Sequence, residues 1–254
     1  MTLINIPNLG TGATLSGPGI PPLAAFSIPS VLRANLQRAY FFGNGALPGA
    51  NKMEDFSDNS YLAAKVGAPV WTPGAGYTCD QNNYFDLGLT DSADLSIAVI
   101  LKRTSSAATG YFGNFNFVDT VTPVNGAGFY SSSSGASLAF VAGRSGMPLP
   151  SGPQASIAAS LDSWGLYLGR ASTGGATIID NLTAGTTGQN TAVTGVARLT
   201  NTQNLRAGAV DGTVYDGAPA VAAAMVWNAV LDPTQKAAVT TTLRAYAATL
   251  GITV

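Results

Sequence analysis

The chain of 254 residues contains no histidine. This absence excludes a Ser-His-Asp triad, a histidine-ligated zinc ion and an imidazole general base. Because Cys79 is the single cysteine, an intrachain disulfide and a CxxC metal or redox pair are excluded as well. We interpret Cys79 as a small buried apolar side chain rather than a reactive thiol.

Charge is also scarce, because Asp, Glu, Lys and Arg make up only 10% of the chain and its net charge is −1. The cations lie singly between Arg33 and Arg244 and form no basic stripe, so we expect no nucleic-acid partner. The start, MTLINIPNLG, lacks the basic and apolar regions of a secretory signal peptide. The longest apolar run, Ala218–Leu231, contains Pro219 and Asn228 and is shorter than the roughly twenty residues that span a bilayer, so we predict no membrane insertion.

Residues 1–29 combine five prolines with many isoleucines and leucines. Proline fixes φ and removes an amide donor, so the stretch is predicted to be extended and irregular. Its apolar side chains are too numerous for a solvated linker. We therefore predict an N-terminal arm over residues 1–29 that docks on a sister subunit or a larger assembly, followed by one domain over residues 30–254.

Short β-prone runs in the middle of the chain alternate with turn residues about every eight to twelve positions, as in a sandwich or barrel. The unbroken apolar run in LSIAVILK is typical of a strand buried on both faces. Helical periodicity is missing between Phe42 and Asp232, so we predict an all-β fold rather than α/β. Strands are predicted at Asn83–Leu89, Leu95–Lys102, Gly128–Ser132, Ser137–Ala142, Trp164–Arg170, Ala176–Asn181, near Asn190–Leu199 and at Leu205–Gly208.

The segment NFNFV predicts an extended run with two different faces. Phe115 and Phe117 share one face, and Asn114 and Asn116 share the other. We expect the phenylalanines to meet the core and the asparagines to meet water.

A short helix is predicted from Ser30, which is placed to cap it, because Leu32, Leu36 and Tyr40 follow at helical spacing. It is expected to give way to a strand by Tyr40. The next stretch, GNGALPGANKMEDFSDNS, is predicted to be a loop because its glycines and proline break regular structure.

A second helix is strongly indicated near the end of the chain. Asp232 can cap its first amides, Pro233 suits the first helical position, and Gln235 suits the third position of a capping box. Gly251 suits the left-handed residue at which helices end. An apolar stripe that packs on the sandwich is predicted at Val239, Leu243, Tyr246 and Leu250.

The segment Asn204–Ile252, NLRAGAVDGTVYDGAPAVAAAMVWNAVLDPTQKAAVTTTLRAYAATLGI, resembles the end of a concanavalin A-like lectin/glucanase domain of the laminin-G-like kind. In that family a strand of the LRIG type leads to a strand that ends in a WNRALS-like phrase and a helix. Upstream, AYFFGNG, DFSDNS, YFDLGL and LSIAVILKR are similar to the family's opening strands, so the likeness covers Ala39–Val254. The resemblance implies a jelly-roll sandwich of two antiparallel sheets, with a C-terminal helix, and many such domains belong to bacteriophage tail-fibre and other virion proteins.

Glycosidases of this superfamily use two glutamates on one strand, whereas Glu54 is the single glutamate here, so a glucanase is not expected. The nearest aspartate couples stand in turn-rich segments, where Asp caps turns, and we interpret them as structural. The relatives often hold calcium, but EDFSDN lacks the DxDxDG spacing, so we expect no cofactor and leave a structural calcium ion as an alternative. The couples are Asp55/Asp58, Asp80/Asp86 and Asp91/Asp94.

A glycan site would place an aromatic ring beside planar polar groups. Trp164 and Tyr167 lie three residues apart in one predicted strand, so they are expected to face opposite sides, with at least one of them in the core. Trp227 is interpreted as a core or helix-packing residue. The candidates for the glycan site are Trp71, Tyr84, Trp164, Tyr167 and Arg170.

Our first hypothesis is a non-enzymatic structural protein of a tailed bacteriophage virion, of tail-fibre, decoration or accessory type. Its partners would be other virion proteins and sister subunits in a homo-oligomer, for which we predict a trimer. The alternative is a carbohydrate-binding module that recognises a host-surface polysaccharide. Both functions can coexist in one receptor-binding fibre.

Overall fold

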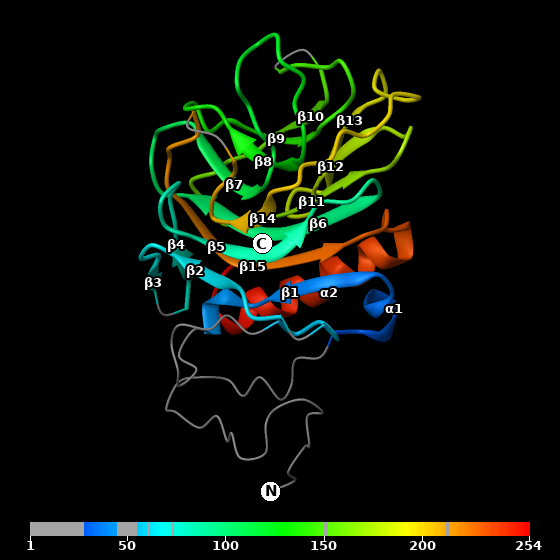
Figure 1. The fold of residues 1–254 in the computed structure, drawn as a ribbon. Coiled ribbons are helices and arrows are strands. Elements are labelled where there is room, and N and C mark those ends of the chain that lie inside the picture. The colour runs from blue at the N-terminus through cyan, green and yellow to red at the C-terminus, as the bar shows by residue number, and fades with distance from the viewer. Residues whose placement is uncertain (1–27, 45–54, 60, 73, 150–151, 212–213) are drawn as a thin grey trace, which may run out of the picture.

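The computed structural model describes residues 28–44, 55–59, 61–72, 74–149, 152–211 and 214–254 (Figure 1). Two antiparallel sheets stack as a β-sandwich, as predicted, and one long helix, α2 (Pro233–Thr249), packs on the outer face of one of them. A single helical turn, α1 (Ser30–Arg33), and a 3-10 turn, η2 (Phe42–Asn44), flank the first strand. Figure 1 shows α1, β1 (Leu36–Tyr40) and α2 together on one side of the sandwich.

The eight-stranded sheet has the order β13-β12-β11-β6-β15-β4-β3, with β1 also paired to β15. The seven-stranded sheet has the order β10-β9-β8-β7-β14-β5-β2. The eight-stranded sheet comprises β1 (Leu36–Tyr40), β3 (Val70–Thr72), β4 (Gly76–Thr78), β6 (Leu95–Arg103), β11 (Gly165–Ala171), β12 (Thr177–Asn181), β13 (Thr186–Asn190) and β15 (Pro219–Trp227). The seven-stranded sheet comprises β2 (Ala64–Val66), β5 (Tyr84–Thr90), β7 (Thr109–Gly113), β8 (Ala127–Ser131), β9 (Ser137–Ala142), β10 (Gln154–Ala158) and β14 (Asn204–Ala207).

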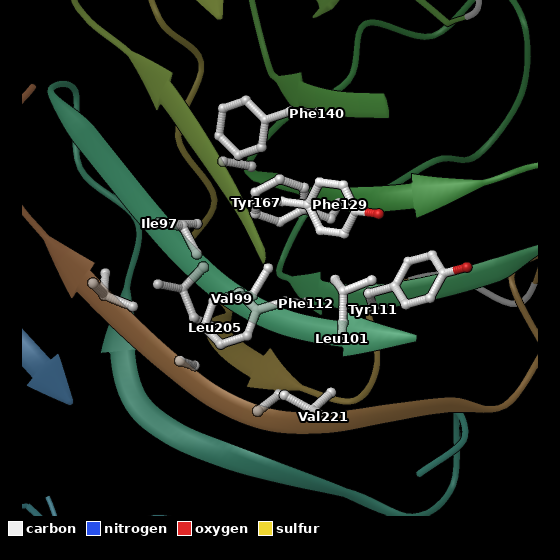
Figure 2. Packing of buried hydrophobic residues seen from close by; sticks show 14 of the residues in the cluster. Ile97, Val99, Leu101, Tyr111, Phe112, Phe129, Phe140, Tyr167, Leu205 and Val221 are labelled. Carbon is white, nitrogen blue, oxygen red and sulfur yellow. The ribbon is translucent and has the colours of Figure 1, made fainter. Parts of the chain in front are cut away.

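The core between the sheets is formed by alternate residues of the strands that face each other (Figure 2). Val99 of β6 belongs to this core, as do Phe112 and Phe129 of the seven-stranded sheet. Ile100, the next residue of β6, faces α2 on the other side of the sheet. Strand β6 is therefore buried on both faces, as its unbroken apolar run predicts.

The C-terminal helix is confirmed together with its cap. The Asp232 carboxylate accepts the Gln235 amide at 2.8 Å, and the Gln235 side-chain oxygen accepts the Asp232 amide at 3.0 Å. Gly251 follows the helix with a φ of 70°, the left-handed conformation that glycine adopts without strain. The predicted stripe faces the sheet, with Val239, Leu243 and Tyr246 buried and Leu250 half-buried against the same cluster.

Trp227 is confirmed as a buried residue of that cluster. Its indole Nε1 donates a hydrogen bond of 2.8 Å to the carbonyl oxygen of Leu32, so the end of β15 is tied to α1. Ile28 is only 5% exposed and packs in the same cluster, although the predicted arm included it. Residues 1–27 of that arm lie outside the described residues.

The helix predicted from Ser30 was wrong beyond its first turn. Pro29 occupies the N-cap position, no side chain caps the turn, and Asn35 adopts a φ of 60° that ends it. Leu36–Tyr40 instead forms a strand that pairs with β15. Strand β15 is buried along its whole length, and pairing with it satisfies the backbone hydrogen-bonding groups of both strands. The described residues of the following loop are irregular after η2, as predicted.

The strand predicted near Asn190–Leu199 was also wrong, because β13 ends at Asn190. The next residues form tight turns, in which the backbone amides of Thr194 and Val196 donate hydrogen bonds to the carbonyl oxygens three positions earlier. Arg144 donates from its side chain to the Val196 carbonyl at 2.9 Å and takes the place of a strand partner.

The prediction that Asn114 meets water was wrong as well. Asn114 is fully buried, accepts the Ala127 amide at 3.0 Å and donates to Asp91 at 3.1 Å. Phe115 and Phe117 do share one face, since both rings contact Tyr215. The remaining predicted strands are present with shifts of at most one residue at their ends. No helix in the described part of the chain is long and apolar enough to cross a bilayer.

Candidate functional site

The five residues predicted as a glycan platform do not come together in one site. Trp71 lies in the edge strand β3, half-buried against the core, and its buried Nε1 has no hydrogen-bond partner among the described residues. Tyr167 points into the sandwich and is 2% exposed. Burial, with a smaller effect of Tyr111, raises the pKa of the Tyr167 hydroxyl to about 12. Tyr167 is therefore a core residue and is not accessible to a sugar.

Trp164 directly precedes β11, and Arg170 lies near the other end of that strand. Trp164 packs against the cluster under α2 and carries the Lys102 ammonium 5.0 Å from its ring centroid, so it faces away from Tyr167, as predicted. The Arg170 guanidinium donates to the Asp180 carboxylate at 2.8 and 3.1 Å and to the Leu231 carbonyl at 3.3 Å. Arg170 therefore holds the strand to the start of α2.

Tyr84 is the predicted residue whose surroundings suit a sugar. In β5, Phe85 and Leu87 belong to the core, so Tyr84 and Asp86 point to the outer face of the seven-stranded sheet. In the neighbouring strand β14, Leu205 belongs to the core, so the residues on either side of it share that outer face.

Those two residues, Asn204 and Arg206, complete a polar surface around the ring. The Arg206 guanidinium carbon lies 5.0 Å from the Tyr84 ring centroid, and Arg206 pairs with Asp211 at 3.2 Å. The Asn204 side-chain amide donates to Asp86 at 2.9 Å. All five residues are half-buried, so each keeps part of its surface in solvent. We call this surface the Tyr84 face (Tyr84, Asp86, Asn204, Arg206 and Asp211).

Asp86 was predicted only as a member of an aspartate couple, and the other polar residues of the Tyr84 face were not predicted. Alternation within NYFDLGL and NLRAG places Tyr84 with Asp86, and Asn204 with Arg206, on single faces. No sequence signal pairs the two segments, because more than a hundred residues separate them, as in the Asn204–Asp86 contact (|i−j| = 118).

A hollow of about 390 Å³ lies between the turn that joins β12 to β13 and the exposed side of α2. Lys236, Thr240 and Arg244 line it from the helix, where they stand four residues apart on one stripe. Asn181 and Thr183 are among the residues that line it from the turn.

The acidic residue beside this hollow is Asp180, whose side chain is fully buried. It accepts hydrogen bonds from Lys236, Thr187 and Arg170 at 2.6, 2.6 and 2.8 Å. Burial by itself raises the pKa of Asp180, but these three partners outweigh it and hold the pKa below its usual value. Asp180 is therefore an ionised carboxylate whose charge is already compensated.

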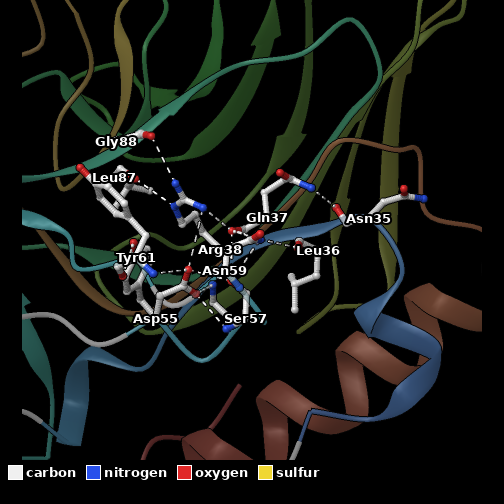
Figure 3. Close-up of polar contacts among 12 residues, drawn as sticks. Asn35, Leu36, Gln37, Arg38, Asp55, Ser57, Asn59, Tyr61, Leu87 and Gly88 are labelled. Carbon is white, nitrogen blue, oxygen red and sulfur yellow. Dashed lines mark hydrogen bonds and ion pairs between the residues drawn. The ribbon is translucent and has the colours of Figure 1, made fainter. Parts of the chain in front are cut away.

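The predicted structural role of the aspartate couples is confirmed for Asp55 (Figure 3). Its carboxylate accepts the amides of Ala39, Ser57 and Tyr61, and the Arg38 guanidinium lies 3.9 Å away. Arg38 also stacks over the Tyr61 ring at 4.5 Å. Asp55 thus fastens an irregular segment to β1.

The other couples have similar roles. Asp80 accepts the Asn82 amide at 2.8 Å, and Asp91 accepts the Asn201 amide at 2.8 Å. Glu54 of the suggested calcium segment lies outside the described residues. Within those residues, no group of three or more acidic, cysteine or histidine side chains is placed to hold a metal ion.

No family model and no curated protein matches the chain. Solved structures do match it: the binding domain of botulinum neurotoxin serotype D has 8% identity and a TM-score of 0.58 over 85% of this chain and 52% of that one. The binding domain of botulinum neurotoxin DC in complex with SialylT has 9% identity and a TM-score of 0.53 over 83% and 52% of the two chains. A mutant Trypanosoma rangeli sialidase that displays trans-sialidase activity has 12% identity and a TM-score of 0.58 over 87% and 34%.

The chain therefore spans about half the length of the neurotoxin domains and a third of the sialidase. At these identities the likeness concerns the fold alone. The chain folds as a β-sandwich similar to the one that these proteins contain.

Proposed function

We propose that this chain is a non-enzymatic carbohydrate-binding domain that binds sugar on the Tyr84 face. The observation that carries the proposal is the outward-facing Tyr84 ring, with the Arg206 guanidinium over one of its faces and an amide and two carboxylates nearby. An aromatic ring can stack on the apolar face of a sugar, and planar polar groups bind the hydroxyls at its rim.

The fold likeness supports the proposal. One similar neurotoxin domain was solved in complex with SialylT, and a similar Trypanosoma rangeli sialidase was solved in complex with sialic acid. Sandwiches of this shape thus occur in proteins that bind sialylated or related glycans. A host-surface polysaccharide is the ligand class that we propose.

The environment of five aspartates supports binding without turnover. Glycoside hydrolysis needs two carboxyl groups that flank the bond and can act as acid and nucleophile or base. Asp55, Asp91 and Asp180 are instead buried and committed to backbone amides or cations. On the Tyr84 face, Asp86 accepts the Asn204 amide and Asp211 pairs with Arg206.

A glycan array probed with the full chain tests the proposal. Tyr84→Ala is expected to weaken saturable binding roughly tenfold or more, because it removes the ring that supports the sugar, whereas Tyr84→Phe keeps the ring and most of the affinity. Trp164→Ala is the matched control, since Trp164 is an aromatic residue on the opposite sheet. Equal binding by Tyr84→Ala and the wild type would place the site elsewhere, and a chain without saturable binding to any glycan would refute the proposal.

We propose as a second function the attachment to a virion through the apolar N-terminal residues. Ile28 is buried in the domain, so the apolar sequence before it starts from a fixed point beside α1. Deleting residues 1–27 while keeping Ile28 is expected to leave a folded domain that no longer forms a trimer or enters the particle. Light scattering and particle incorporation measure this, and normal incorporation of the deleted form would contradict it.

A further inference from the structure

The hollow between the β12–β13 turn and α2 is well defined on its strand side. Within the turn, Asn181 accepts the Ala184 amide on its side chain at 3.0 Å and the Gly185 amide on its carbonyl at 2.8 Å. Gly185 adopts a φ of 71°, and Arg244 clamps the turn to α2 by donating to the Leu182 carbonyl at 2.7 Å. The lining is therefore held by hydrogen bonds from both elements.

The charge of the hollow is positive. Lys236 and Arg244 both line it, and the neighbouring Asp180 is already balanced by Arg170 and Lys236. Arg244 has no ion-pair partner in the part of the chain that the structure describes. No residue that lines the hollow carries a carboxylate. A positive hollow in a chain of net charge −1 favours an anionic ligand.

The hydrogen-bonding groups of the hollow are mainly donors. One Arg244 nitrogen is used by the Leu182 carbonyl, and the planar guanidinium keeps further N–H groups for a ligand. The Thr183 hydroxyl accepts the Leu166 amide at 2.8 Å, so its own hydrogen remains available to donate. A carboxylate accepts from such a set of donors, whereas a neutral hydroxyl uses only part of it.

The volume of about 390 Å³ lies within the range of small-molecule sites, roughly 300–1,000 Å³, and exceeds what a bare anion needs. We propose that this hollow binds a carboxylate-bearing sugar residue, with Arg244 and Lys236 on the carboxylate and Thr183 donating to it. The inference rests on the proposed carbohydrate-binding function and adds the ligand class: an acidic glycan, held at a site distinct from the Tyr84 face.

Titration of the full chain with monosaccharides, followed by NMR, tests this inference. The probes are glucuronic acid and N-acetylneuraminic acid, with glucose as the neutral counterpart of glucuronic acid and sulfate as a bare anion. We expect an acidic sugar to shift the amide signals of the turn residues 182–185 at concentrations roughly tenfold lower than glucose or sulfate. The binding should weaken as salt rises from about 0.01 to 1 M, because the hollow is open to solvent.

Arg244→Gln is expected to weaken binding of the acidic sugar roughly tenfold. Arg244→Lys should lose less affinity than Arg244→Gln, because lysine keeps the positive charge but lacks the planar guanidinium that can donate two parallel hydrogen bonds. Lys65→Gln is the matched control: it removes one exposed cation at β2, outside the hollow, and should leave affinity within about twofold. Equal affinity for glucose, equal affinity for sulfate, or an Arg244→Gln variant that binds like Lys65→Gln would each overturn the inference.

Tyr84→Ala separates this inference from the proposed function. If the variant loses neutral-glycan binding while Arg244→Gln binds every sugar normally, the Tyr84 face is supported and the hollow is refuted. If acidic sugars still shift the turn in Tyr84→Ala, the hollow is supported as an independent site. A chain that binds none of these monosaccharides refutes the hollow, whereas the glycan array decides the Tyr84 face separately.

Discussion

A buried ion pair between Arg198 and Asp91 joins loops that are far apart in the sequence. The pair is 2.9 Å long, and both side chains are fully buried. Arg198 also donates to the Gly143 carbonyl at 3.1 Å. Asp91 accepts the Asn201 amide at 2.8 Å and the Asn114 side chain at 3.1 Å. The pair thus holds the segment after β13 against the end of the sandwich.

Arg198→Met removes the cation and leaves the Asp91 carboxylate buried with neutral donors. Breaking a fully buried pair by removing one partner costs about 3–5 kcal/mol, most of it from the charge left without compensation. A domain of this size has about 5–15 kcal/mol of stability in total. Since 1 kcal/mol lowers Tm by about 2–4 °C in domains of roughly 150–250 residues, we expect Tm to fall by about 10 °C.

Urea unfolding and calorimetry measure the loss, and Arg33→Met is the control. Arg33 pairs with Asp58 on the surface, where the side chains are 41% and 70% exposed, so its loss should cost at most about 1 kcal/mol. The double variant Asp91→Asn/Arg198→Met should recover much of the stability, because neither charge of the pair is left buried without its partner.

The pH dependence provides a second check. Burial raises the pKa of Asp91 although Asn201, Arg198 and Asn114 favour its charged form. Without Arg198 that pKa rises further, so the deficit of Arg198→Met should shrink as the pH falls and Asp91 becomes neutral. A single variant within about 1 kcal/mol of the wild type, or a double variant no better than the single one, would refute the reasoning.

Three further predictions follow from named contacts. Because the folded pKa of Asp180 is lowered, the stabilisation by its carboxylate is present above the unfolded pKa near 4 and is lost as the pH falls through the folded pKa. Asp180→Asn should therefore flatten the pH dependence of the urea unfolding midpoint between about pH 2 and 5. An unchanged slope of the midpoint against pH would contradict this. Asp232→Ala should cost about 1 kcal/mol and speed hydrogen exchange of the Gln235 amide, and a helix start protected as in the wild type would argue against the cap. Burial, and then Asp80, raise the pKa of the Cys79 thiol to about 12, so a thiol reagent at about pH 8 should label it only after unfolding, and rapid labelling of the native protein would be inconsistent with this burial.

Local sequence was sufficient where one segment contains all the interactions that define it. The capping box of α2 uses residues three positions apart, and Gly251 needs only its own backbone freedom. Strand β6 was recognisable because its apolar run is continuous. By contrast, β10 and β13 were not predicted, because the polar and small residues of QASIA and TTGQN carry little strand signal.

The wrong predictions concern segments whose conformation is decided by partners that are distant in the sequence. Leu36–Tyr40 has helical spacing but becomes a strand because β15 supplies its ladder. Asn114 is polar, yet it is buried because Asp91 and the Ala127 amide satisfy it. The segment after Asn190 has β-branched residues, but side-chain donors such as Arg144 take its carbonyls.

The candidate site was predicted only in part for the same reason. Tyr84 could be proposed from its aromatic character and its strand, but Arg206 and Asn204 reach it only because β14 pairs with β5. Tyr167 had the right chemistry on the wrong side of its strand. The hollow beside Arg244 needed both the β12–β13 turn and the docked helix.

By itself the sequence determined the all-β class, the capped C-terminal helix and the exclusion of imidazole chemistry, because these depend on residue types and on spacings within single segments. Tertiary structure alone decided which strands are neighbours, which aromatic rings face solvent, and where two cations, Lys236 and Arg244, line one hollow. Those features depend on contacts between residues far apart in the sequence, such as Trp227 with Leu32 (|i−j| = 195), and no local pattern encodes them.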